Sequence, residues 1–189
     1  EGADMRVAII TGASSGLGCE YARLADARGG YDQIWAVARR AGRLKALARE
    51  LRTPVRQVVL DLLDPSAMDE LGDMLADAAA QADSVGDALE VALLVNAAGL
   101  GKLGTYADVT RREVDAMVGL NCRVLVDVTQ LALPYMRRGA RLMQIASSAS
   151  FQPLPGLNVY AATKAFVRSY TRALRFELRG RGIRVTAVC

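Results

Sequence analysis

A short stretch near the N-terminus, residues 5–18, reads MRVAIITGASSGLG. Its first six residues are mostly apolar and rich in β-branched side chains, which predicts a buried strand. A turn containing Gly12, Gly16 and Gly18 follows, and a helical pattern then continues to residue 27 before a glycine pair stops it. A strand, a glycine-rich turn and a helix in this order are typical of the first unit of a nucleotide-binding α/β sheet.

Strand-like and helix-like segments alternate along the rest of the chain. The predicted strands cover residues 5–10, 33–38, 55–60, 91–95, 141–146 and 183–188. The predicted helices after the first cover residues 42–52, 65–82, 107–138 and 160–179, with one break expected near residues 111–113. Apolar strands alternating with helices predict a parallel sheet covered on both faces. We therefore expect one doubly wound α/β domain over residues 1–189, Rossmann-like, with the strand order 3-2-1-4-5-6.

Composition excludes several classes of function. A chain of 189 residues with 52% hydrophobic and 23% charged residues is typical of one packed domain. Cys19, Cys122 and Cys189 have no metal-ligand spacing, and histidine is absent, so no metal site and no histidine-dependent nucleophile is expected. We expect the three thiols to be reduced and buried. The net charge of +4 is spread along the chain, so no nucleic-acid partner is predicted.

The sequence also gives an expectation about location. No apolar run approaches the roughly 20 residues that span a bilayer, and the N-terminus lacks the basic and apolar regions of a signal peptide. We therefore expect a soluble, cytoplasmic protein without a membrane partner.

A second functional signal is the stretch from Asn158 to Phe166, which places Tyr160 and Lys164 four residues apart at the start of a predicted helix. Positions four apart share one helix face, so the ammonium can reach the neighbourhood of the phenol. A nearby cation favours the phenolate form of a tyrosine and eases proton exchange near neutrality. The pair is a candidate acid/base device.

Five motifs, in order and in register, resemble those of the short-chain dehydrogenase/reductase family. They are Thr11-Gly-x-x-x-Gly-x-Gly18, Asn96-Ala-Ala-Gly99, Asn121, Ser147 and Tyr160-x-x-x-Lys164, and the resemblance covers nearly the whole chain. It implies an oxidoreductase that transfers a hydride between a nicotinamide cofactor and a carbonyl or secondary alcohol.

The resemblance assigns a role to each candidate catalytic residue. Tyr160 would protonate the carbonyl oxygen or accept the hydroxyl proton, and Lys164 would favour the phenolate and bind the nicotinamide ribose. Ser147 would hydrogen-bond the reacting oxygen, with Ser148 as the alternative one residue away. Asn121 would hold a water that relays protons to the lysine.

Cofactor contacts are expected from the glycine turn and the end of the second strand, and the resemblance implies further contacts from the end of the third strand and from the Asn-Ala-Ala-Gly motif. The predicted set is Gly12, Ser14, Ser15, Gly16, Leu17, Gly18, Arg39, Arg40, Asp61, Leu62, Asn96, Ala97, Ala98 and Gly99, together with Tyr160 and Lys164. An acid after the second strand holds the ribose of NAD, whereas an arginine accommodates the phosphate of NADP. Arg39 and Arg40 stand there without an acid, so NADP is favoured, with Arg39 as the main contact, and NAD remains the alternative.

Two other functions stay open at this point. A Rossmann-type sensor or scaffold would bind nucleotide without turnover, but an intact Ser147, Tyr160 and Lys164 argue against it. A sugar-nucleotide epimerase or dehydratase is disfavoured by the glycine spacing. Residues 151–157 are expected to line one wall of the pocket, and their apolar character points to an apolar or aromatic carbonyl substrate.

Two further expectations concern the whole molecule. The resemblance implies a homodimer or homotetramer, with outer faces of the long helices partly buried between chains. The residues predicted there are Leu125, Val128, Phe166 and Leu174. The sequence stops on an apolar strand at Cys189, where the family continues, so we expect residues 1–189 to be part of a longer polypeptide, with a C-terminal portion missing.

Overall fold

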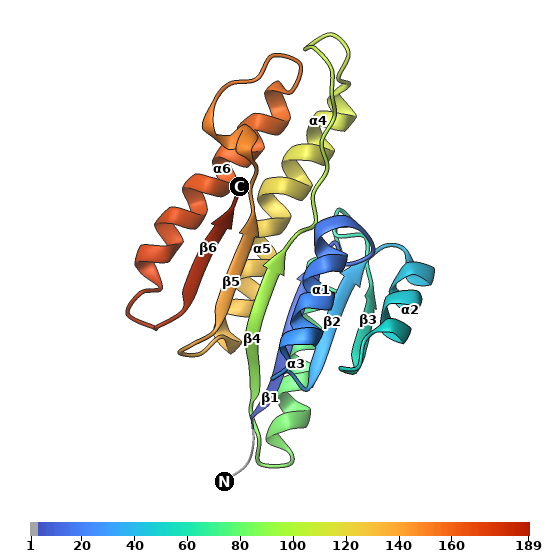
Figure 1. Cartoon of the computed structure of the whole chain (residues 1–189), viewed down its shortest axis with the longest axis vertical. Coiled ribbons are helices and arrows are strands. Elements are labelled where there is room, and N and C mark those ends of the chain that lie inside the picture. Colours follow the sequence, from blue (N-terminus) through green and yellow to red (C-terminus); the bar gives the residue numbers. More distant parts are fainter. Residues whose placement is uncertain (1–3) are drawn as a thin grey trace.

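Six parallel strands form one twisted sheet in the order β3-β2-β1-β4-β5-β6 (Figure 1), in a computed structural model that describes residues 4–189. The strands are β1 Met5–Thr11, β2 Gln33–Ala38, β3 Val55–Val59, β4 Leu89–Asn96, β5 Arg141–Ile145 and β6 Arg184–Val188. All five neighbouring pairs are parallel. The predicted fold class and strand order are confirmed.

Helices cover both faces of the sheet because the strand side chains alternate between them. In β1, Ala8 and Ile10 pack with α1 (Gly16–Arg28) and α2 (Ala41–Glu50) on one face. Val7 and Ile9 pack with the helices of the other face. Those helices are α3 (Ala67–Asp83), α5 (Val124–Ala132) and α6 (Asn158–Glu177), and α4 (Arg111–Val118) leads into α5.

The order of the strands fixes where a ligand can bind. β1 pairs with β2 on one side and with β4 on the other, and the last residue of β1, Thr11, lies opposite Val37 and Asn96. From β1 the chain first builds the sheet on one side, as β2 and β3, and then crosses to the other side of β1 to form β4. This switch opens a crevice at the carboxyl ends of the strands, where sheets of this kind bind their ligands.

The predicted helix over residues 107–138 is shorter and differently interrupted in the structure. Its α-helical part begins at Arg111, because Thr110 and Glu113 form a reciprocal capping box at the N-terminus. The break expected near residues 111–113 is therefore the start of the helix. The real irregularity is a π-helical turn, Gly119–Arg123, and the run ends in a 3₁₀ turn, Leu133–Tyr135.

The continuous helical run Arg111–Tyr135 has 25 residues, and by its length and apolar composition alone it could cross a membrane. Core helices of globular proteins satisfy the same criterion. Here Met117, Val124 and Val128 are buried inside the molecule, and the last two pack on the sheet side of the core.

Three of the four residues expected on outer faces of the long helices lie inside the chain instead. Leu125, Val128 and Leu174 are buried inside the chain, because the helical period turns them toward the sheet. Phe166 is 44% exposed and does lie on an outer face. The outer-face prediction was thus wrong for three residues and correct for one.

The cysteines also differ from the expectation. All three are free, as predicted, but Cys19 and Cys122 are only half-buried and Cys189 is exposed.

Candidate functional site

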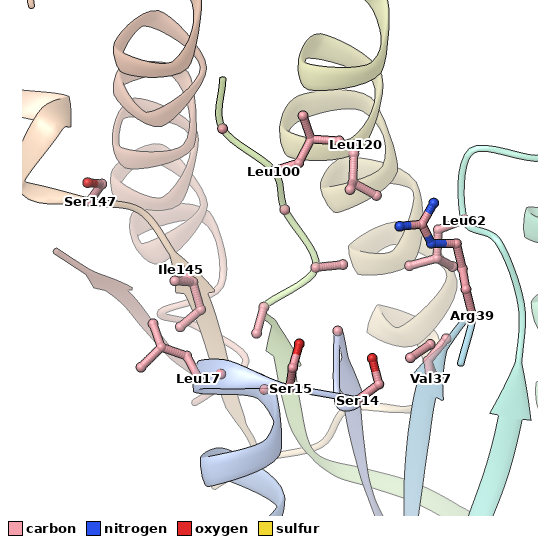
Figure 2. A pocket seen from close by; sticks show the side chains of 18 of the residues that line it. Ser14, Ser15, Leu17, Val37, Arg39, Leu62, Leu100, Leu120, Ile145 and Ser147 are labelled. Carbon is pink, nitrogen blue, oxygen red and sulfur yellow. The ribbon is translucent and has the colours of Figure 1, made fainter. Parts of the chain in front are cut away.

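A cavity of about 700 Å³ lies at the carboxyl ends of the strands (Figure 2). Figure 2 shows Ser14 and Ser15 of the glycine turn between Arg39 on one side and Ser147 on the other. The volume suits a sizeable small molecule. All the predicted site residues line the cavity except Asn96 and Asn121, which are buried beneath it.

The glycine turn approaches neighbouring backbone so closely that side chains are excluded. A β-carbon on Gly12, whose φ is +71°, would lie 2.8 Å from the Ala98 nitrogen, and one on Gly18 would overlap the Gly12 carbonyl. Helix α1 begins here with no acidic residue in its first turn and no side-chain cap. Its free N–H groups and positive dipole end suit a phosphate group. The turn therefore fits the pyrophosphate of a dinucleotide.

The two arginines after β2 take different positions. The Arg40 guanidinium donates to the Ser14 hydroxyl at 2.9 and 3.2 Å and to the Ser15 hydroxyl at 2.7 Å. Arg39 pairs with Asp61 at 3.6 Å. The end of β2 carries no acidic residue, as the sequence indicated. Asp61, two residues after β3, nevertheless places a carboxylate beside Arg39. Arg40 and the two serine hydroxyls thus form one hydrogen-bonded group, and Arg39 and Asp61 line the same cavity as a separate pair.

Asn96 supports the site from below. Its amide donates to the Thr129 hydroxyl at 3.0 Å, and the Gln144 amide of β5 donates to the same hydroxyl at 2.9 Å. Thr129 in turn donates to the Leu125 carbonyl. This buried threonine of α5 therefore joins β4 to β5 below the cavity floor.

Ser147 and Ser148 both border the cavity, but their environments differ. The Ser147 oxygen accepts a hydrogen bond from the Ala149 N–H at 3.1 Å, at the start of a 3₁₀ turn, Ser148–Phe151. This contact fixes the Ser147 side chain and leaves its hydroxyl hydrogen free to be donated. Ser148 is exposed.

Lys164 is buried beside the tyrosine. Its side-chain nitrogen lies 5.7 Å from the centre of the Tyr160 ring and donates to the Ile145 carbonyl at 2.7 Å. Burial lowers the pKa of Lys164 from its ordinary value, while Cys122 acts weakly in the opposite direction. The ammonium is therefore held in place, largely out of water, at the end of β5.

Asn121 lies in the π-helical turn, and its side chain makes three hydrogen bonds. Its oxygen accepts from the Leu100 N–H at 2.9 Å, and its nitrogen donates to the Leu100 carbonyl at 2.8 Å and to the Thr163 hydroxyl at 3.0 Å. The amide therefore bridges the segment after β4 and the second turn of α6. Irregular helical turns of this type are frequent at functional sites.

The sequence analysis missed several residues of the site. Those that line the cavity or support it include Thr163, Leu100, Gly101, Leu120 and Val188. Only Thr163 carried a usable signal, because a helical threonine bonds the carbonyl three or four residues earlier. The others contact the cavity through long-range packing that no local pattern encodes.

The wall expected from residues 151–157 does not border this cavity in the described part of the chain. The side chain of Phe151 is largely exposed, and its ring lies 4.3 Å from the Arg168 guanidinium of α6. Within residues 4–189 no group of three or more metal-ligating side chains is found.

Comparison with known proteins gives a consistent picture. The sequence profile of the short chain dehydrogenase family matches residues 6–189. Sulfoacetaldehyde reductase 2 of Chromohalobacter salexigens is 39% identical over 189 residues, covering 96% of this chain and 70% of that protein. Serine 3-dehydrogenase of Agrobacterium fabrum is 34% identical over 183 residues, with 95% and 69% of the two chains covered.

Solved structures agree with the sequence relatives. The closed form of a serine dehydrogenase complexed with NADP+ superposes with a TM-score of 0.80 at 33% identity. The superposition covers 97% of this chain and 70% of that one.

Proposed function

The chain belongs to the short-chain dehydrogenase family, and from this premise we propose that it is an NADP-dependent oxidoreductase of carbonyl compounds and secondary alcohols. The observation that carries the proposal is the shared cavity. Ser147, Tyr160 and Lys164 border the same 700 Å³ space as the glycine turn. A protein that only sensed nucleotide would not need a fixed hydroxyl donor, a phenol and a buried ammonium in the lining of that space.

The residues present fit NADP. The glycine turn and the N-terminus of α1 would hold the pyrophosphate, and Arg39, Arg40 and Ser14 would hold the 2′-phosphate. The serine dehydrogenase structure complexed with NADP+, which is 33% identical to this chain, supports the choice of NADP over NAD. When bound, the nicotinamide would supply or accept the hydride.

The chain's own residues would handle the proton and the developing charge. Tyr160 would donate its phenolic proton to the carbonyl oxygen, and Ser147 would donate a hydrogen bond to the same oxygen. Lys164, fixed by the Ile145 carbonyl, would stabilise the phenolate that remains. Asn121 would keep the surrounding backbone in place through Leu100 and Thr163.

For substrates, the named relatives favour small polar carbonyl or hydroxy compounds. A sulfoacetaldehyde reductase and a serine 3-dehydrogenase are both more than 30% identical to this chain. The apolar or aromatic substrate predicted from residues 151–157 has less support, because these residues do not border the cavity in the described chain.

The proposal predicts that Tyr160→Phe lowers the rate of NADPH-dependent reduction by about 10²- to 10⁴-fold, the usual contribution of a positioned acid. The measurement is NADPH consumption with sulfoacetaldehyde, an aromatic ketone and an aliphatic aldehyde, together with NADP reduction by serine. Tyr170→Phe, on the same helix and outside the cavity lining, is the matched control and should keep full activity. If wild type and Tyr160→Phe were equally slow with every compound, the nucleotide sensor would be the better account.

A further inference from the structure

The segment that follows Asn96-Ala-Ala-Gly99 runs along the Tyr160 ring. Gly101 meets the ring with its bare backbone: a β-carbon at this position would lie 2.9 Å from Cδ2, 3.1 Å from Cε2 and 3.4 Å from Cγ of Tyr160. Carbon atoms in contact prefer about 3.5–4.0 Å. Any side chain at position 101 must therefore push the ring or the backbone back by about 0.6 Å or more.

The backbone beside Gly101 is held by Asn121. Two hydrogen bonds join its carboxamide to the N–H and carbonyl of Leu100, at 2.9 and 2.8 Å. The same carboxamide donates to Thr163, whose hydroxyl donates to the Tyr160 carbonyl at 2.7 Å. One side chain thus fixes both the backbone of Tyr160 and the segment against which its ring packs.

The segment is also tied down beyond Gly101. The Gly104 N–H donates to the Gly156 carbonyl at 2.8 Å, and the Lys102 ammonium pairs with Glu113 of α4 at 2.8 Å. Tyr160, by contrast, is only half-buried. If a side chain were added at Gly101, the Tyr160 ring would therefore move more easily than the backbone of residues 100–104.

We propose that Gly101 is a positioning residue for Tyr160: its missing side chain lets the ring lie where the phenol borders the cavity that Ser147 also lines. The requirement is steric, because Gly101 is not among the glycines with positive φ, so alanine fits its backbone conformation. The inference rests on the proposed role of Tyr160 as the acid and adds a residue that would set its orientation.

The test is Gly101→Ala. We expect kcat for carbonyl reduction to fall by about 10- to 100-fold, because a displacement near 1 Å at a reacting group has this effect. The Kd for NADPH, measured by fluorescence titration, should change much less than kcat, because the three atoms nearest to the new β-carbon all belong to the Tyr160 ring. The melting temperature should stay near the wild-type value, because Gly101 is exposed. Gly180→Ala is the matched control: a β-carbon there meets nothing within 4 Å, and activity should not change.

A double-mutant cycle separates positioning from a general disturbance. If Gly101 acts through Tyr160, adding Gly101→Ala to Tyr160→Phe should cause no further loss of the residual rate. Full activity of Gly101→Ala, the same proportional loss in both backgrounds, or a parallel loss of NADPH binding or thermal stability would each overturn the proposal. A fully active Tyr160→Phe would instead contradict the proposed function itself.

Discussion

Among single residues, Arg39 and Arg40 are adjacent in the sequence, but their side chains bind different partners. Arg40 hydrogen-bonds the serines of the glycine turn, whereas Arg39 lies beside Asp61. Asp61 also accepts from the Leu63 N–H, which holds the carboxylate at the end of β3. A phosphate placed here would meet Arg40 already oriented by Ser14 and Ser15, and would compete with Asp61 for Arg39.

We therefore predict that both arginines contribute to NADP affinity. Arg39→Ala and Arg40→Ala should each raise the Kd for NADPH by about 10- to 100-fold, the effect of losing a hydrogen bond to a charged group. The Kd for NADH should change little, because NADH lacks the phosphate. Fluorescence titration of both cofactors gives the answer, with Arg49→Ala at the far end of α2 as the control. Unchanged NADPH affinity in both variants would remove the basis for NADP preference.

The sequence predicted the identities of the site residues better than their contacts. The residues expected to bind cofactor came from short motifs whose residue types are tied to chemistry, such as glycines for close approach and arginines for phosphate. Which arginine meets the glycine turn depends on how α2 starts, and what Asn121 bonds depends on a π-helical turn. Neither is encoded in local spacing.

At the scale of elements, Asp26 of α1 ties the turn before β3 to the helix. Its Oδ1 accepts from the Thr53 N–H at 2.7 Å and from the Arg52 N–H at 3.1 Å. The Thr53 N–H is the main cause of a lowered pKa for Asp26, whose ordinary value is 3.8. Stabilisation by this carboxylate is therefore complete above the ordinary pKa and is lost as pH falls through the lower pKa of the folded state.

This linkage predicts that Asp26→Ala lowers the free energy of unfolding by about 1–3 kcal/mol at pH 7, since two backbone donors lose their acceptor. The difference from wild type should shrink as the pH falls below 3.8, because wild type then loses its own carboxylate. Urea denaturation at several pH values measures it. Asp26→Asn, which keeps a neutral acceptor, should be less affected at pH 7. A difference that stayed constant down to acid pH would contradict the assigned role.

The type and order of the elements were predictable, but some boundaries were not. Apolar strands alternating with helices predicted the six-stranded parallel sheet, because helices cover both faces of such a sheet and its strands are apolar on both sides. The helix expected from residue 107 starts at Arg111, because Thr110 and Glu113 act as a capping box and not as a break. The capping pattern was present in the sequence, so this boundary was open to prediction, whereas the π-helical turn was not.

At the scale of the whole molecule, assembly into a homodimer or homotetramer stays a prediction. Phe166 is exposed and stacks on Tyr170, with ring centres 6.1 Å apart, and Phe176 on the same helix is 75% exposed. On α6 the exposed large apolar side chains are Phe166 and Phe176, whereas Leu174 is buried. On the helical run that carries Asn121, Val118 is 45% exposed, whereas Leu125 and Val128 are buried.

Hydride transfer with Tyr160 as the proton donor can be followed by isotope transfer from the cofactor to the product. NADPH carrying two deuterium atoms at C4 of the nicotinamide is incubated with the protein and the carbonyl compounds of the panel, and the products are analysed by mass spectrometry. Wild type should form an alcohol with one deuterium on the former carbonyl carbon, and Tyr160→Phe should form the same product about 10²- to 10⁴-fold more slowly. Cofactor binding without deuterated product from any compound, or equal labelling rates in the two proteins, would contradict this mechanism.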